Sequence, residues 1–404
     1  MEGEPRDDAR RWGMLALLSL AVLLGMSVWF TASAVSPLLR AEWGLSASQV
    51  GWLTTLVQLG FVAGTAAAAV LNLADILPAR GYFAATAVLA AAANLAVLLA
   101  PSYELVLAFR FLTGFFLAGV YPTAMKMAAT WFLKGRGVAI GTVVGALTLG
   151  KAAPFLMGSL EGWGLPPVVT GASLGAVGGA LLVLMFYRPG PHAFLRKPFS
   201  WDLVGVVARH RPTRLAIWGY LGHMWELYAF WSAVVLFLAG HLAAQGADQP
   251  ESGAAFWTFV VIAVGGLGAI HAGRLADRVG REAVASGALL VSGALALGVG
   301  WLLAAPSWVV LPLLLVWGYA VVADSAQFSA LVTEVSPSHA VGTALTLQTS
   351  LGFLLTMVTI QGTPVLAEVA GWGWAFAFLA PGPLVGLWAM ARLHQLRADA
   401  APGA

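Results

Sequence analysis

Twelve long apolar stretches constrain the fold of this chain more than any other feature of its sequence. A membrane-spanning helix needs about 20 predominantly apolar residues, and these stretches are close to that length or longer. Because lipid offers no hydrogen bonds to an open backbone, we expect each stretch to be an α-helix. The predicted spans are 14–39, 49–72, 83–100, 104–128, 137–158, 167–187, 215–240, 254–272, 283–305, 308–333, 341–366 and 373–393.

The composition agrees with lipid as the solvent of the chain. Hydrophobic residues make up 60% of its 404 residues and charged residues only 10%, whereas soluble domains carry about 25% charged residues. This contrast excludes a soluble enzyme and a disordered chain. The absence of cysteine excludes disulfides and thiolate metal sites, and a net charge of +3 gives no reason to expect nucleic acid. We therefore predict an all-α membrane protein.

The connections between the spans predict both the domains and the orientation. The one long internal connection, 188–214, is predicted to link an N-terminal six-helix bundle (1–187) to a C-terminal one (215–404). Basic residues collect in cytoplasmic loops. With both termini in the cytoplasm, Arg40 is the only basic residue that falls in an outer segment. The first span is too long for a signal-peptide core, so we interpret it as a retained helix.

Two short patterns recur between the halves. The Leu-Ala-Asp sequence that ends at Asp75 returns at Asp277, 202 residues later, and the Gly-Thr pair that starts at Gly141 returns at Gly342 after 201 residues. Both offsets are close to half the length of the chain, so the bundles are predicted to be pseudo-symmetric. Duplicated helix bundles of this kind are a transporter architecture, with the substrate site near the midplane between them.

The loop Gly273–Arg281 reads Gly-Arg-Leu-Ala-Asp-Arg-Val-Gly-Arg and resembles the signature loop of the major facilitator superfamily. Asp75 with Arg80 is similar to a degenerate copy of it, and the Arg110-x3-Gly114-x4-Gly119-x2-Pro122 pattern resembles that family's span-4 motif. The resemblance implies twelve transmembrane helices in two six-helix bundles (the major facilitator fold), alternating access and, most closely, the bacterial branches that carry small anions. It implies the bacterial inner membrane as the location. The asparagine-rich nitrate signature is absent.

The signature loop also predicts a cytoplasmic latch. A carboxylate at Asp277 can cap the positive N-terminal end of a neighbouring helix, such as the span that begins near Gly137. Arg278 or Arg281 can pair with Glu334 at the end of another span. The alternative is an ordinary turn with solvated charges. The predicted gating residues are Asp75, Arg80, Gly273, Asp277, Arg278, Arg281 and Glu334.

Ionisable residues inside the spans are the main functional candidates, because such groups are costly in lipid. The cations Arg110, Lys126 and Lys151 lie in the first half, and Lys126 is close enough to a span end to reach the interface. The other group, in the second half, consists of His223, Glu226 and Asp324. We interpret Arg110 and Lys151 as ligands of an anion. The alternative for Arg110 is a packing role, bonded to the backbone carbonyls of the first span.

Proton coupling is assigned to Glu226 or Asp324 together with His223, because burial favours the neutral form of a carboxyl group and lets it take up a proton. Further candidates for substrate contacts are Trp29, Gln58, Tyr121 and Gln327. The predicted function is secondary active transport of a small anion or organic acid with protons. The alternative is proton-driven export of drugs or other organic cations, with the acidic residues holding the substrate.

Other classes fit less well. The segment from Gly145 to Lys151 is close to a phosphate-binding loop, but Ala152 lacks the required hydroxyl and the segment lies within a span. A receptor with a transporter fold would need room for an output domain, and an enzyme would need a nucleophile or metal cluster that the sequence does not show. We predict no cofactor and no metal, and we expect a monomer whose partners are a small-molecule substrate, protons and the lipid bilayer.

Overall fold

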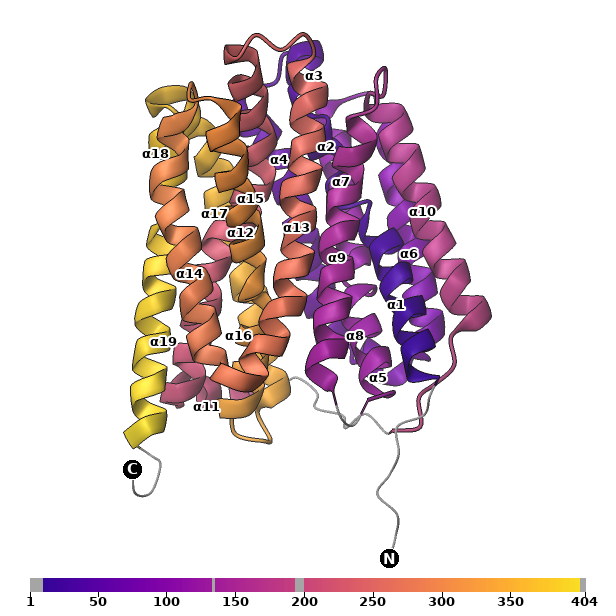
Figure 1. Cartoon of the computed structure of the whole chain (residues 1–404). Coiled ribbons are helices and arrows are strands. Elements are labelled where there is room, and N and C mark those ends of the chain that lie inside the picture. Colours follow the sequence, from indigo (N-terminus) through magenta and orange to yellow (C-terminus); the bar gives the residue numbers. More distant parts are fainter. Residues whose placement is uncertain (1–9, 133–134, 193–199, 400–404) are drawn as a thin grey trace, which may run out of the picture.

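The structure is a computed structural model that describes residues 10–132, 135–192 and 200–399, and every regular element in these ranges is a helix. Within them, eleven helical spans are long and apolar enough to cross a membrane. They lie side by side along one long axis (Figure 1). Six of the spans are single helices: α4 (Ala47–Val70), α9 (Arg136–Gly158), α10 (Leu165–Phe186), α12 (Arg211–Ala244), α13 (Pro250–Val279) and α17 (Val341–Ala370).

The other five long spans consist of two consecutive helices each. They are α6 (Ala79–Ala96) with η1 (Val97–Leu99), α7 (Tyr103–Leu117) with α8 (Tyr121–Ala129), α14 (Arg281–Gly298) with η3 (Val299–Leu302), α15 (Ser307–Ala323) with α16 (Ser325–Val335), and α18 (Trp372–Ala377) with α19 (Pro381–Asp399). The break before α8 and the break at Asp324 fall at corresponding places in the two halves. This agrees with the duplication inferred from the sequence.

The first span differs from the prediction of one helix over 14–39. It consists of α1 (Arg11–Met26), α2 (Thr31–Ala34) and α3 (Ser36–Trp43), with a non-helical segment at 27–30. A break in lipid requires other partners for the freed backbone groups. Here the carbonyls of Val28 and Trp29 accept hydrogen bonds from Arg110, so the break leaves neither carbonyl unsatisfied.

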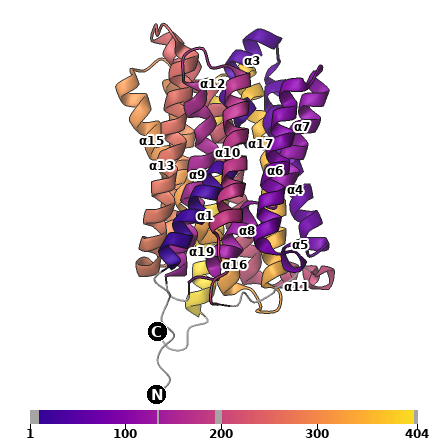
Figure 2. The ribbon, with the colours of Figure 1, turned by 90° about the vertical axis from the view of Figure 1, so that its right-hand side faces the viewer.

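The helices form two bundles that correspond to the two halves of the sequence. In Figure 1, α6 and α10 of the first half lie on the right and α14 and α19 of the second half on the left. The halves meet mainly along α9 with α13 and along α4 with α17, and Figure 2 gives the view at right angles. The start of α1 and the end of α19 lie at the same end of the molecule, together with α5 (Leu73–Ile76) and α11 (Val204–Arg209). We call it the Arg11 end.

Glycine contacts are tighter within a half than between the halves. A Cβ at Gly114 of α7 would lie 2.0 Å from the carbonyl oxygen of Val57 in α4, so the two backbones touch. A Cβ at Gly145 of α9 would lie 3.2 Å from the carbonyl oxygen of Gly266 in α13. At these two positions, the backbones within one half approach more closely than the backbones of α9 and α13 do across the halves.

The connection between the halves is only partly described, because 193–199 lie outside the described residues. The part that follows contains η2 (Trp201–Leu203) and α11, and α12 begins at Arg211, four residues before the predicted start at 215. The domain division at 188–214 stays a prediction.

Candidate central site and gates

Lys151 of α9 lies at the centre of the molecule, between the halves, and is 1% exposed. Its Nζ atom lies 3.8 Å from the ring centroid of Trp29 in α1's break, and 4.4 Å and 5.8 Å from those of Tyr228 and Trp231 in α12. It donates a hydrogen bond to the Tyr228 hydroxyl. Among the described residues, no carboxylate forms an ion pair with Lys151. A desolvated cation on an aromatic face gains about 2 kcal/mol, so rings replace the missing counter-ion.

A continuous set of aromatic rings from both halves surrounds this ammonium group. Trp29 packs on Phe61 at a centroid distance of 5.1 Å, and Phe61 packs on Phe353 at 4.7 Å. Tyr228 contacts Phe353 at 5.3 Å. We call the whole set the aromatic cage; its members are Trp29, Phe30, Phe61, Phe155, Tyr228, Trp231 and Phe353, all buried.

The cage and its neighbourhood contain buried hydrogen-bond donors that have no partner among the described residues. The indole N–H groups of Trp29 and Trp231 are buried without a partner among the described residues, and so is the side-chain amide of Gln58. Gln58 lies three residues before Phe61 and therefore on the same face of α4. A buried donor without a partner costs about 1–3 kcal/mol. Together with Lys151, these groups are suited to a ligand that accepts hydrogen bonds and carries negative charge.

Arg110, predicted to bind an anion, lies behind Trp29 and is fully buried. Its guanidinium group supports the break in the first span, as in the alternative inferred from the sequence. It donates to the carbonyl of Leu53 (3.2 Å), the carbonyl of Val28 (3.1 Å), Oγ1 of Thr31 (2.9 Å), Oδ1 of Asn94 (3.1 Å) and the carbonyl of Trp29. With its donors so engaged, Arg110 acts on the cage through the position of Trp29.

His223 and Asp324 form a buried pair in the second half. Nδ1 of His223 lies 2.8 Å from Oδ1 of Asp324, and both side chains are 2% exposed. Nε2 of His223 lies 2.9 Å from the hydroxyl of Ser325. Asp324 occupies the junction between α15 and α16. The pair therefore connects α12 with the broken span at the position where the chain leaves one helix and enters the next.

Glu226, the other predicted proton carrier, faces the interior of the second bundle. Its Oε1 accepts a hydrogen bond from Nε1 of Trp317 at 2.6 Å, and its Oε2 accepts one from the Ser292 hydroxyl at 2.8 Å. Residues two apart on a helix do not share a face, so Glu226 and Tyr228 of the cage point in different directions. Protonation of Glu226 would therefore act on contacts inside the second bundle, and it would not act directly on the cage or on the interface between the halves.

Two further candidates make no hydrogen bond or ring contact with Lys151 among the described residues. Oε1 of Gln327 accepts a hydrogen bond from Nη1 of Arg281 at 3.1 Å, which places Gln327 beside the predicted latch. Tyr121 begins α8 and packs against the hydrophobic core. The predicted site residues that the structure brings together at the centre are therefore Lys151, Trp29 and, on a neighbouring helix face, Gln58.

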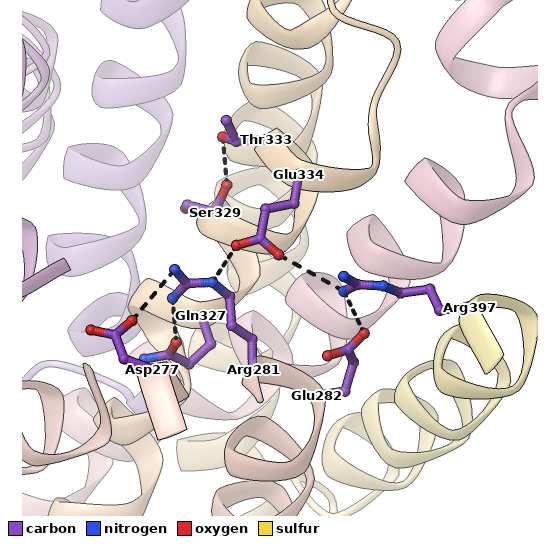
Figure 3. Close-up of polar contacts among 8 residues, drawn as sticks. All are labelled: Asp277, Arg281, Glu282, Gln327, Ser329, Thr333, Glu334 and Arg397. Atoms are coloured by element: carbon purple, nitrogen blue, oxygen red, sulfur yellow. Dashed lines mark hydrogen bonds and ion pairs between the residues drawn. The ribbon is translucent and has the colours of Figure 1, made fainter. Parts of the chain in front are cut away.

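The predicted latch residues form a charged cluster at the Arg11 end (Figure 3). Nε of Arg281 lies 2.6 Å from Oε1 of Glu334, and Nη2 of Arg281 lies 3.8 Å from Oδ1 of Asp277. Arg397 of α19 extends the cluster, because its Nη1 lies 2.7 Å from Oε1 of Glu282 and 3.8 Å from Oε2 of Glu334. The cluster therefore links α13, α14, α16 and α19.

The signature loop also contacts the other half. A Cβ at Gly137 would lie 3.5 Å from Oδ2 of Asp277, so this carboxylate lies beside the start of α9, as a helix cap requires. Gly273 lies opposite the same residue, and a Cβ there would be at ordinary contact distance, 3.7 Å, from the carbonyl oxygen of Gly137. Arg278 and Arg80 are exposed. The side chain of Asp75 lies outside the described residues.

The end of the molecule opposite the Arg11 end is closed by residues that the sequence analysis did not propose. Arg40 of α3 pairs with Glu368 of α17, across the two halves. The Ser252 hydroxyl donates to the carbonyl of Ser159 at 2.5 Å, which joins α13 to the end of α9. The isolated position of Arg40, the one basic residue in the predicted outer segments, was the available signal. These contacts join the halves at this end, and the members of the aromatic cage are buried between the halves.

Comparisons with known proteins agree with this architecture. The family model described as Major Facilitator Superfamily matches residues 17–355. The uncharacterized transporter YgaY of Escherichia coli, from strain K12 and from O157:H7, is 28% identical over 155 residues. That match covers 37% of this chain and 39% of the curated relative, so the chain matches well under half of the relative's length.

Two solved structures share the fold. The nucleoside transporter NupG superposes with a TM-score of 0.71 at 15% identity, over 94% of this chain and 99% of that chain. A bacterial homolog of the human lysosomal transporter Spinster, inward-facing and unoccupied, superposes with a TM-score of 0.68 at 16% identity, over 97% and 96%. At these identities the likeness shows the fold alone.

Proposed function

Because the chain belongs to the Major Facilitator Superfamily and is a membrane transporter rather than an enzyme, we propose that it moves a small anion or organic acid together with protons. The family itself is the one that the loop Gly273–Arg281 predicted. The substrate, the coupling ion and the location in the bacterial inner membrane, with both termini in the cytoplasm, are parts of the proposal.

One observation supports an anion as the substrate: the ammonium group of Lys151 is buried between the halves, and no carboxylate of the described residues pairs with it. The unpaired indole N–H groups of Trp29 and Trp231 add neutral donors around it. An anion bound here would pair with Lys151 in a desolvated site, where charge–charge attraction is much stronger than in water. Arg110 would contribute by keeping Trp29 in place.

The buried acids of the second half support proton coupling. Asp324 faces His223 at 2.8 Å, and a proton added to either residue changes the attraction between α12 and the junction of α15 with α16. Since Tyr228 and Trp231 also lie on α12, movement of this helix would reach the cage. Glu226 is the second candidate, held by Trp317 and Ser292.

We further propose that transport proceeds by rocking of the two bundles, 1–187 and 215–404, in one monomer. The Asp277 contact with the start of α9 would form the cytoplasmic gate, and the Arg281–Glu334 pair, which lies within the second half, would hold Asp277 in position through the contact of Arg281 with Asp277. Arg40 and Glu368 would form the outer one. The less close packing of α9 against α13 is what a moving interface requires.

The test is exchange of labelled anions in proteoliposomes that contain the full chain. A panel of inorganic anions and monocarboxylates is screened, and Lys151→Gln is expected to lower the exchange rate of the accepted anion at least tenfold. Lys126→Gln is the matched control, because it makes the same chemical change near the end of α8 and is expected to retain exchange. Normal exchange by Lys151→Gln would contradict the anion site.

The aromatic cage itself favours a second candidate, an organic cation. Rings that hold the ammonium group of Lys151 at 3.8 Å can hold a substrate's ammonium group in its place. The same variant separates the two functions. Lys151→Gln removes the competing internal cation, so it is expected to abolish anion exchange, whereas cation export would be retained or increased.

A further inference from the structure

Within the part of the chain that the structure describes, the aromatic cage contains one available charge and several ring faces. Lys151 is the charged group that contacts its rings, and the nearby Arg110 is engaged with backbone carbonyls. One positive charge matches one negative charge on the ligand. If the proposed anion site is correct, a monoanion therefore fits this site better than a dianion.

The aromatic rings of the cage determine which kind of group fits next to the negative charge of the ligand. When the ammonium group turns toward an anion, it leaves the face of Trp29, which it now contacts at 3.8 Å. A bare inorganic anion would leave this face and that of Tyr228 against empty space, and a void in a packed interior is costly. A ligand that also carries an aromatic ring would cover both faces and restore ring-to-ring contacts.

The geometry of the rings suits a flat group between the halves. Trp29 belongs to the first half and Tyr228 to the second, and their rings lie 5.9 Å apart with an interplanar angle of 31°. Phe30 and Tyr228 are similarly arranged, at 6.4 Å and 30°. Because the two faces belong to different halves, the movement that separates the halves also separates the rings and makes a slot.

We propose that the transported anion is an aromatic monocarboxylate. Its carboxylate pairs with Lys151 and accepts hydrogen bonds from the indole N–H groups of the cage, which are unpaired in this structure. Its ring occupies the slot between Trp29 and Tyr228. This inference rests on the proposed anion function and names the substrate class for that site.

Equilibrium binding to the purified full chain tests the class. The probes are benzoate, cyclohexanecarboxylate, acetate, nitrate, phthalate and benzylamine. Cyclohexanecarboxylate is the decisive control, because it matches benzoate in charge and approximate size but has no aromatic face. We expect benzoate to bind at least tenfold more tightly than cyclohexanecarboxylate, acetate, nitrate or phthalate, and to bind at least tenfold more weakly to Lys151→Gln.

Variants of the cage test its role directly. Trp29→Leu keeps an apolar side chain but removes the ring, and is expected to bring benzoate down to the affinity of cyclohexanecarboxylate. Lys126→Gln, which changes a lysine of α8 outside the cage, is the matched control and is expected to retain the preference for benzoate. If Trp29→Leu does not yield a monodisperse protein, the same comparison is made with Trp231→Leu.

The outcomes separate this inference from the proposed function. Equal affinity for benzoate and cyclohexanecarboxylate, or tighter binding of nitrate or acetate, overturns the aromatic class and leaves the anion function standing. Binding of benzylamine without binding of any anion overturns both. A preference for benzoate that persists in Lys151→Gln, Trp29→Leu and Trp231→Leu places its binding site elsewhere and overturns the inference.

Discussion

Arg110 donates a hydrogen bond to the backbone carbonyl of Trp29, at the point where the first span leaves helical geometry. The same side chain also donates a hydrogen bond to the carbonyl of Val28, two residues after α1 ends. A non-helical segment within a membrane persists only if its polar groups are satisfied by protein. Arg110 therefore allows the first span to break, and the break places the Trp29 ring against Lys151.

The first prediction concerns this support. Arg110→Gln and Arg110→Lys should both lower the stability of the empty protein, because neither side chain can supply the planar set of donors that the carbonyls require. Each buried carbonyl left without a donor costs about 1–3 kcal/mol, so we expect a clear drop in the thermal unfolding temperature. The measurement is a melting curve in detergent without substrate.

A direct substrate contact would behave differently. A residue that only binds the anion would weaken binding when changed, while the empty protein would melt as before. Lys151→Gln provides the comparison for both measurements, because Lys151 is the buried charge in the proposed binding site. An unchanged melting curve for Arg110→Gln, together with weakened binding, would assign Arg110 to the substrate rather than to the break.

The sequence predicts those parts of the molecule that depend on local patterns. The spans follow from runs of apolar residues, and their boundaries differ from the structure by a few residues at most ends. The pairing of Arg278 or Arg281 with Glu334 and the position of Asp277 beside Gly137 were predicted from the charges at helix ends and, mainly, from the resemblance of this loop to the family's signature loop. The structure has Arg281 beside Glu334 and Asp277 beside Gly137. The Arg397 extension was not predicted, because it depends on how α19 packs.

The break at 27–30 and the aromatic cage could not be predicted in this way. The apolar residues Val28, Trp29 and Phe30 fit a helix as well as a break, and the decision depends on Arg110 and Asn94, far away in the sequence. Likewise, Tyr228 and Trp231 become relevant only because the second half packs against Lys151. Contacts between distant segments determined both features.

The second prediction concerns the charged cluster at the Arg11 end. Arg281→Gln should change stability little, because partly exposed ion pairs contribute about 0–1 kcal/mol, but it should open the proposed gate more often. We expect faster labelling of a cysteine introduced at Gln58, a buried position near the cage, in a chain that has no cysteine of its own. The exchange of charges in Arg281→Glu with Glu334→Arg should restore slower labelling. Equal labelling in all variants would remove this pair from the gate.

The third prediction separates proton coupling from substrate movement. Asp324→Asn and Glu226→Gln remove the group that takes up the proton but keep a similar shape. The variant at the true coupling residue should lose accumulation of substrate driven by a pH gradient, and should retain exchange of labelled for unlabelled substrate. Both activities are measured in the same proteoliposomes. If gradient-driven accumulation survives in both single variants and in the double variant, neither acid couples transport to protons.

The last prediction compares two glycines that differ in what they touch. Gly114→Ala would place a methyl group 2.0 Å from the carbonyl oxygen of Val57, within one half, so it should destabilise the fold strongly and lower the yield of monodisperse protein. Gly145→Ala would place it 3.2 Å from the carbonyl oxygen of Gly266, across the halves, where a small shift can accommodate it. We expect this variant to fold with a nearly normal melting curve but to exchange substrate more slowly, since a methyl group roughens the surface along which α9 and α13 move. Melting curves and exchange rates of the two variants provide the comparison. Normal exchange in Gly145→Ala would show that this contact does not limit the movement of the halves.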